Sequence, residues 1–166
     1  MKRLFNIIQR LSVGMTWKMF RALLSRPLLI IPTLWATVES ILFAEINFKG
    51  NSSGRDIPNA FRHAVWNLLI AKNSSYFTSE TKAVAWAKFI TDLHEDCFPN
   101  EPFDREMDLH NNQVGRNLYV ELRKKQIYQK KEMISELMDK CNSAVGLTDE
   151  KTFERFVNEL VFYSEN

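Results

Sequence analysis

The chain is poor in the residues that favour turns and strands. Its 166 residues include five glycines and five prolines, and short runs of alternating β-branched residues are scarce. Glycine and proline interrupt regular structure, and alternating β-branched residues are typical of strands, so their scarcity favours an all-α fold. An apolar fraction of 45% and a charged fraction of 25% are ordinary for a globular protein. The length suits a single domain with a substantial core.

Cysteine is scarce too, and its placement argues against two kinds of site. Cys97 and Cys141 lack the spacing of a metal motif and are too few for a disulfide framework. We therefore expect a reducing compartment, the cytoplasm. The chain has no G-x-S-x-G motif, and neither cysteine has an evident activating neighbour, so no nucleophile for covalent catalysis stands out.

Acidic residues are absent from the beginning of the chain. Six basic residues precede the first acid, Glu39: Lys2, Arg3, Arg10, Lys18, Arg21 and Arg26. Apolar residues recur at helical spacing over residues 1–26 and predict one or two short basic amphipathic helices, and no cleavage site of a signal peptide follows. We favour a helix packed on the body of the protein with a solvated basic face. The alternative is peripheral contact of residues 1–26 with the inner membrane surface.

Residues 27–44 form the most apolar segment. It is just long enough to span a membrane, but it contains Pro32 and Glu39. We therefore predict a core helix from about residue 32 to about residue 46, with Trp35, Val38 and Leu42 on its periodic face. The polar residues 47–55 form a loop, which divides the single domain into an N-terminal segment, 1–46, and a body, 55–166.

The chain is organised around a helix over residues 58–71. Asp56 is a suitable N-cap, and Pro58 fits a first helical turn. The segment is apolar on nearly every side, which predicts a buried helix. Asn59, His63 and Asn67 nevertheless form a polar stripe at i, i+4 and i+8. Buried polar side chains need partners, and these are either protein groups or a metal or substrate.

Four more helices are predicted after this one. They begin near Ser79, Asp104, Gln129 and Thr148, and the last has an apolar face of Phe153, Phe156, Val157, Leu160 and Val161. The fold class is therefore all-α, a single-domain bundle of about six to eight helices with a buried central helix.

Two details of these helices bear on a site. The helix that begins near Ser79 has Trp86, Phe89, Ile90, Leu93 and Cys97 as its apolar stripe, so His94 lies at the edge of the buried face and Glu95 points away from it. Gly115 lies inside the next helix. Because glycine has no Cβ, another backbone or a ligand can approach closely there.

All three histidines fall between residues 63 and 110, each within a polar cluster. Inward groups on facing helices form metal sites in helical bundles, and imidazole with carboxylate suits zinc, manganese or iron. We predict that His63, His94 and Asp108 bind one divalent metal, with Glu95 as a further ligand or catalytic carboxylate. A metal-bound water would then attack a phosphoester or a lipid-like ester. Asn111 and Asn112 would orient the substrate, and Arg62 or Arg116 would neutralise its charge.

The order His…His-Glu…Asp is loosely similar to the His…His-Asp…Asp order of helical HD-type phosphohydrolases, with Glu95 in place of the aspartate. A metal-free alternative uses His63 or His94 as a general base steered by Asp108 or Glu95. A non-enzymatic alternative is a helical protein that binds a membrane surface or a partner, with structural polar clusters. We do not expect nucleic-acid binding, because the basic residues 123–125 and 130–131 are better explained as a solvated face.

Three stretches resemble one family pattern: residues 61–67, 91–95 and 107–116. They resemble an uncharacterised bacterial all-α domain family with the motifs NAFRHAxWN, HE and MDLHNNxxGR, which also occurs in toxin-like secreted proteins. The resemblance implies a hydrolytic or toxin-derived function. Its motif positions correspond here to Asn59, Arg62, His63, Trp66, Asn67, His94, Glu95, Asp108, His110, Asn111, Asn112, Gly115 and Arg116.

Overall fold

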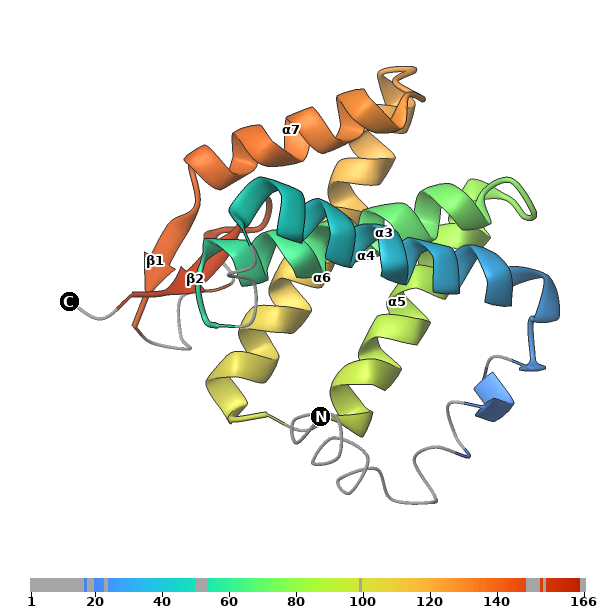
Figure 1. Cartoon of the computed structure of the whole chain (residues 1–166), viewed down its shortest axis with the longest axis horizontal. Coiled ribbons are helices and arrows are strands. Elements are labelled where there is room, and N and C mark those ends of the chain that lie inside the picture. Colours follow the sequence, from blue (N-terminus) through green and yellow to red (C-terminus); the bar gives the residue numbers. More distant parts are fainter. Residues whose placement is uncertain are drawn as a thin grey trace.

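A computed structural model of the chain describes residues 17, 20–22, 24–49, 54–98, 100–148, 153 and 155–164. Most of the basic N-terminal segment, and with it the expectation of a packed or membrane-bound helix over residues 1–26, lies outside these residues. The described part contains six helices and two short strands (Figure 1): η1 Pro27–Leu29, α3 Ile30–Phe48, α4 Ile57–Ser74, α5 Glu80–Cys97, α6 Pro102–Lys124, α7 Lys130–Asn142, β1 Val145–Leu147 and β2 Val161–Tyr163. The predicted all-α class is confirmed.

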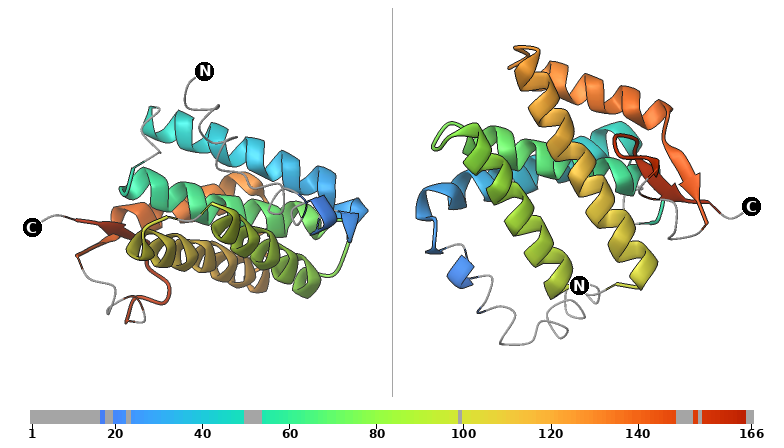
Figure 2. Two further views of the ribbon diagram at one scale, coloured as in Figure 1. Left: turned by 90° about the horizontal axis from the view of Figure 1, so that it is seen from below. Right: turned by 180° about the vertical axis from the view of Figure 1, so that it is seen from behind.

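Helix α4 is the centre of the bundle, as its composition predicted. It contacts α3, α5, α6, α7 and β2, and Figure 2 shows it between α3 on one side and the pair α5 and α6 on the other. The N-cap prediction is also confirmed, since the Asp56 side chain accepts a hydrogen bond of 3.1 Å from the backbone N–H of Asn59. Pro58 lies in the first turn, where no N–H is needed.

The close approach of α6 to α4 depends on Gly115. A Cβ atom at this position would lie 2.0 Å from the carbonyl oxygen of Ala64, well inside any real contact distance. Residue 115 therefore has to be glycine for the two backbones to touch, which offsets the roughly 1 kcal/mol that glycine costs inside a helix. This contact confirms the close backbone approach predicted at Gly115.

The prediction of a final helix that begins near Thr148 is wrong. Residues 161–163 instead form β2, which pairs in parallel with β1 in the register Val145↔Val161. Asn111 of α6 fixes this strand by bonding both polar groups of one residue: its Nδ2 donates to the Val161 carbonyl at 2.9 Å, and its Oδ1 accepts from the Val161 N–H at 3.0 Å. Because these tertiary bonds satisfy the backbone of Val161, the local helical period of the sequence does not decide its structure.

Helix α3 was expected to be a core helix, and its orientation corrects that expectation. Its buried residues are Pro32, Thr33, Ala36, Ser40 and Ala44, which are small or polar. The large apolar side chains expected to face the core are exposed, with Trp35 at 57% and Leu42 at 52%. Pro27–Phe48 is also the one segment among the described residues that is long and apolar enough to cross a membrane.

Candidate functional site

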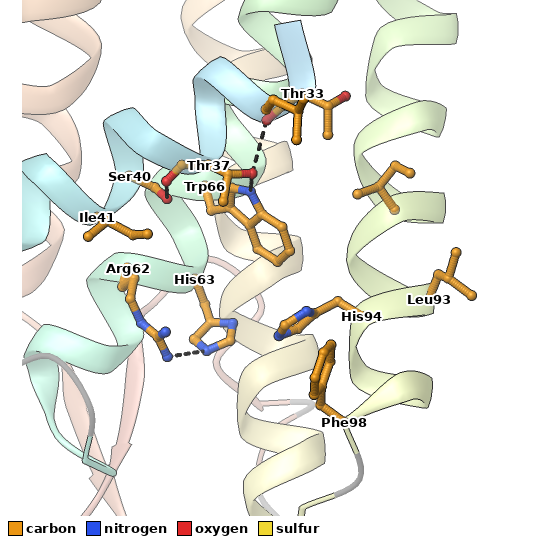
Figure 3. Close-up of a pocket in the computed structure, with 12 residues that line it drawn as sticks. Thr33, Thr37, Ser40, Ile41, Arg62, His63, Trp66, Leu93, His94 and Phe98 are labelled. Carbon is orange, nitrogen blue, oxygen red and sulfur yellow. Dashed lines mark hydrogen bonds between the residues drawn. The ribbon is translucent and has the colours of Figure 1, made fainter. Parts of the chain in front are cut away.

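A cavity of about 400 Å³ opens between α3, α4 and α5. Most of its wall is apolar and includes Leu34, Ile41, Trp66, Leu93 and Phe98 (Figure 3). Its polar end is formed by α4, through Arg62 and His63. A largely apolar cavity with a few convergent polar groups is the usual form of a small-molecule site.

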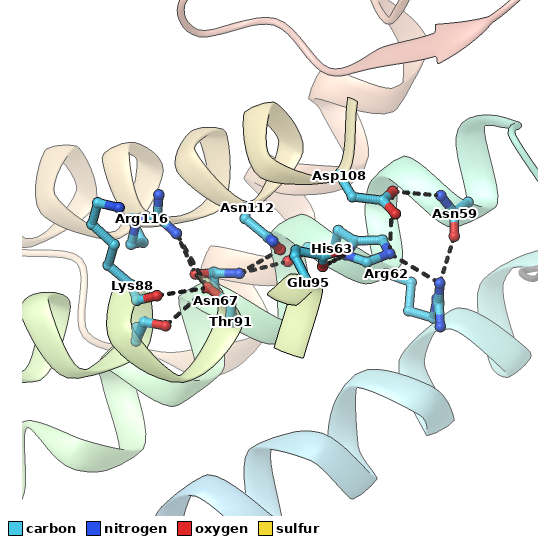
Figure 4. A network of polar contacts seen from close by, with 11 residues as sticks. Asn59, Arg62, His63, Asn67, Lys88, Thr91, Glu95, Asp108, Asn112 and Arg116 are labelled. Atoms are coloured by element: carbon cyan, nitrogen blue, oxygen red, sulfur yellow. Dashed lines mark hydrogen bonds and ion pairs between the residues drawn. The ribbon is translucent and has the colours of Figure 1, made fainter. Parts of the chain in front are cut away.

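Behind His63, two carboxylates approach from two other helices (Figure 4). Oε1 of Glu95 on α5 lies 3.7 Å from Nδ1 of His63, and Oδ1 of Asp108 on α6 lies 3.3 Å from Nε2. The three residues are buried, and one ligand-capable atom from each lies within 4.8 Å of the others. We call these three residues the His63 cluster.

Arg62 and Asn59 link His63 to Asp108 within this cluster. Nη2 of Arg62 lies 3.0 Å from Nε2 of His63 and donates a hydrogen bond of 2.5 Å to Oδ1 of Asn59. Nδ2 of Asn59 donates to Oδ1 of Asp108 at 3.0 Å. If Nε2 accepts from Arg62, the remaining ring proton of a neutral imidazole is on Nδ1 and faces Glu95.

Four buried polar atoms in this region have no hydrogen-bond partner among the described residues. They are Nδ1 of His63, Oε1 of Glu95, Nδ2 of Asn112 and Nε of Arg62. Buried polar atoms are almost always bonded, so several such atoms around one histidine indicate that the site is built to bind something besides the protein. The donor set, one imidazole and two carboxylates, fits a divalent metal.

The protonation of the cluster follows from its burial. Burial and, second to it, the nearby carboxylate of Asp108 raise the pKa of Glu95 to about 8, against the opposing effect of the Asn112 side chain. Burial also raises the pKa of Asp108 to about 6, against the hydrogen bond from Asn59. The pKa of His63 is lowered well below its usual value, first by burial and then by the Arg62 guanidinium. The site therefore favours a neutral imidazole and resists two bare carboxylates, which a bound cation would stabilise.

A second layer of polar residues supports the cluster on the side away from the cavity. Nδ2 of Asn67 donates to Oδ1 of Asn112 at 2.6 Å and to the His63 carbonyl at 3.2 Å. Oδ1 of Asn67 accepts from Nη1 of Arg116 at 2.7 Å and from the Thr91 hydroxyl at 3.1 Å. Asn67 thereby fixes both Asn112 and the backbone at His63. Such supporting bonds hold ligands in orientation.

The structure brings some of the predicted site residues together and places the others elsewhere. His63, Asp108 and Glu95 come together, and Asn112 and Arg62 lie beside them. The prediction that Glu95 points away from the buried face is wrong, because its residue exposure is only 2%. His94 is not in the cluster; it forms the cavity wall, with its ring centroid 5.1 Å from that of Trp66 and 4.7 Å from that of Phe98.

Two further predicted residues have supporting roles. Asn111 binds β2, as described above, and Arg116 contacts the back of the network rather than the cavity. Asn59 and Thr91 were not predicted as site residues. For Asn59 the polar stripe shared with His63 was a usable signal, and for Thr91 the signal was its place at the start of the motif stretch 91–95, four residues before Glu95.

Comparison with known proteins gives one match. Residues 20–145 match the model of a family described as a domain of unknown function (DUF6973). No curated protein and no solved structure matches the chain.

Proposed function

The chain belongs to the DUF6973 family, and we propose that it is a metal-dependent hydrolase that cleaves a phosphoester or ester bond of an amphiphilic, lipid-like substrate. The metal ligands in this proposal are His63, Glu95 and Asp108. The observation that carries the proposal is the convergence of these three buried side chains around His63, which also lines the polar end of an apolar cavity.

The proposed ligand set differs from the one expected from the sequence in one residue. Glu95 takes the place of His94, because its Oε1 faces His63 while the His94 ring packs on Trp66 and Phe98. A divalent cation among two carboxylates and an imidazole would replace the protons that burial otherwise holds on Glu95 and Asp108. Zinc, manganese and iron all accept such ligands.

The bound metal would supply a water of lowered pKa as the attacking nucleophile. The protein groups have separate tasks. Nδ2 of Asn112, which is buried next to Glu95, is a donor for an oxygen held at the cluster. Arg62 touches the cluster and also lines the cavity, so its guanidinium is placed to neutralise an anionic substrate group. In this scheme Arg62 exchanges its contact with His63 for one with the substrate.

The cavity suggests the substrate class. Its apolar wall would accept an alkyl or acyl chain, while Arg62 and His63 lie at the end where a polar head would be cleaved. A volume of about 400 Å³ is within the range of small-molecule sites and accommodates part of a lipid rather than a macromolecule.

Elemental analysis of purified wild-type protein and four variants tests the proposal. We expect about one metal ion per chain in the wild type, and affinity weakened by more than about 100-fold in His63→Ala and Asp108→Ala. His94→Ala and His110→Ala are matched controls and should keep the metal, because His94 lies in the cavity wall and Nε2 of His110 contacts the Glu159 carbonyl. Circular dichroism verifies that each variant is folded.

Hydrolysis of chromogenic phosphodiester and acyl-ester substrates should be lost in the same two variants that lose metal. A wild-type protein that binds no metal after reconstitution, with His63→Ala and Asp108→Ala merely destabilised, would overturn the proposal. The His63 cluster would then be a buried structural network. Loss of metal in His94→Ala as well as in His63→Ala and Asp108→Ala would instead support the ligand set expected from the sequence.

A further inference from the structure

The outer face of α3 is a continuous apolar surface. Ile31, Leu34, Trp35, Val38, Ile41, Leu42 and Ile46 recur at helical spacing on this face, and all are exposed, Ile31 at 77% and Ile46 at 74%. Exposed apolar residues are normal when scattered, but a strip along about four helical turns marks a surface that binds something. We call these seven residues the α3 face.

From this we propose that the α3 face lies on an anionic lipid bilayer and that the cavity takes its substrate directly from that bilayer. This inference rests on the proposed hydrolase for its substrate and deepens it by naming where the substrate comes from. The alternatives, a second copy of the chain or a helix that crosses the membrane, are outcomes that the test below separates.

The buried side of α3 argues against a spanning helix. Trp66 and Trp86 donate hydrogen bonds of 2.9 Å each from their indole N–H groups to the hydroxyls of Thr37 and Thr33. Glu39 is turned inward and bonds Asn73 and Lys130 of the body. Helix α3 is thus attached along its length to polar groups of α4, α5 and α7. A helix so attached presents one face to a membrane and lies along its surface.

The charges next to the α3 face fit anionic headgroups. Arg21 and Arg26 are exposed, and neither forms an ion pair with another described residue. They alternate with exposed Phe20 and Leu24. Four more basic residues, Lys2, Arg3, Arg10 and Lys18, precede them in the sequence. Basic residues beside aromatic and aliphatic ones are the composition of an interfacial membrane segment. The one exposed acid of α3, Glu45, is near the C-terminal end of the helix.

The α3 face and the cavity share residues. Leu34 and Ile41 belong to the exposed strip and also line the cavity that leads to His63. A lipid that leaves the bilayer at these two residues would enter an apolar wall without passing through water. The catalytic cluster lies at the far end of that path, on α4, α5 and α6. A contact with a second copy of the chain would instead cover this entrance.

Flotation with lipid vesicles tests this inference. Wild-type protein, with its complete N-terminal segment, is mixed with vesicles of phosphatidylcholine alone or of phosphatidylcholine with phosphatidylglycerol. We expect binding that is stronger to the vesicles containing phosphatidylglycerol. Ile31→Gln/Trp35→Gln should weaken binding by about tenfold, because two large apolar contacts with the bilayer are lost. Neither residue lines the cavity.

The matched control is Val120→Gln/Val157→Gln, which changes two exposed valines away from α3 and should bind vesicles as the wild type does. His63→Ala should also bind vesicles fully while losing metal, and Ile31→Gln/Trp35→Gln should keep its metal. These two results separate failure of the docking surface from failure of the hydrolase.

Four results would overturn the inference. Wild-type protein that binds neither kind of vesicle would exclude a bilayer as the partner. A dimer in sedimentation that Ile31→Gln/Trp35→Gln converts to a monomer would identify a second copy of the chain as the partner of the α3 face. Equal vesicle binding by wild type and Ile31→Gln/Trp35→Gln would place membrane contact elsewhere. Protein released from vesicles only by detergent, and not by high salt or alkali, would indicate a spanning helix.

Discussion

At the scale of single residues, Glu95 is the group whose protonation controls the site. Its raised pKa means that the folded protein holds a proton that the unfolded chain releases at lower pH. Between the ordinary pKa of a glutamate and about 8, the folded state therefore binds more protons than the unfolded state. The contribution of Glu95 to the stability of the metal-free protein therefore falls as pH rises through this range.

The histidines limit the pH interval in which the effect of Glu95 on stability can be measured by itself. The pKa values of His63 and His94 are lowered by burial, that of His94 to about 4, so both increase stability with rising pH up to the ordinary histidine range. The pKa of Asp108 is raised to about 6, so its contribution to stability falls with rising pH only up to about that value. From about pH 6.5 to pH 8, Glu95 is the member of the site that titrates in the folded state.

We therefore predict that metal-free wild-type protein loses about 1 kcal/mol of unfolding free energy per pH unit over this interval. Glu95→Gln, which is neutral at every pH, should remove most of that slope. Urea denaturation at several pH values in the presence of a chelator measures both proteins. A wild-type slope of zero, or the same slope in Glu95→Gln, would show that Glu95 is ionised in the folded protein.

At the scale of secondary-structure elements, Asn111 determines the position of β2. We predict that Asn111→Ala lowers the free energy of unfolding by about 2 to 4 kcal/mol, because the buried N–H and C=O of Val161 both lose a partner. Metal binding at the His63 cluster should be unchanged. Gln113→Ala, at an exposed position on the same helix, is the control and should change stability by less than about 0.5 kcal/mol.

Chemical denaturation measures the stability of the two α6 variants, and metal titration measures their metal binding. Loss of metal or of hydrolysis in Asn111→Ala at unchanged stability would restore the substrate-orienting role that the sequence suggested for Asn111.

The elements show which features a sequence determines locally. Helices α4 and α5 were predicted closely because Asp56 and Ser79 cap them and their apolar residues keep the helical period. The strand β2 was missed because its structure depends on Asn111, fifty residues earlier in the chain. Local periodicity contains no information about such a partner.

The position of Glu95 was missed for a related reason. Large apolar residues were assumed to mark the buried face of α5, but the most buried line on it is Ala83, Ala87, Thr91 and Glu95, at intervals of four. Small side chains let helices pack closely, so this line faces the neighbouring helices, and Glu95 is brought to His63 with it. The bulkier Leu93 and Phe98 border the cavity. On α3 too, the small and polar residues are buried and the large ones exposed.

At the scale of the whole molecule, the three proposed metal ligands come from α4, α5 and α6, so metal binding should be linked to folding. We predict that metal at about 100 times its dissociation constant adds about 2.7 kcal/mol to the unfolding free energy, and that a chelator removes this gain. Calorimetry with added metal and with chelator measures the shift. The same gain in Asp108→Ala would mean that the metal binds outside the His63 cluster.

The contact between Gly115 and Ala64 has a mechanical consequence for this arrangement. It lies one residue from His63 on α4 and three from Asn112 on α6, and backbone touches backbone there, so these two helices cannot slide or approach further without a collision. The side chains of α4 and α6 are therefore held at a fixed distance from one another. When a metal or substrate binds, the elements that can move are α5, which carries Glu95, and α3, which borders the cavity entrance. Whatever presses on α3 from outside would then set how wide the entrance opens.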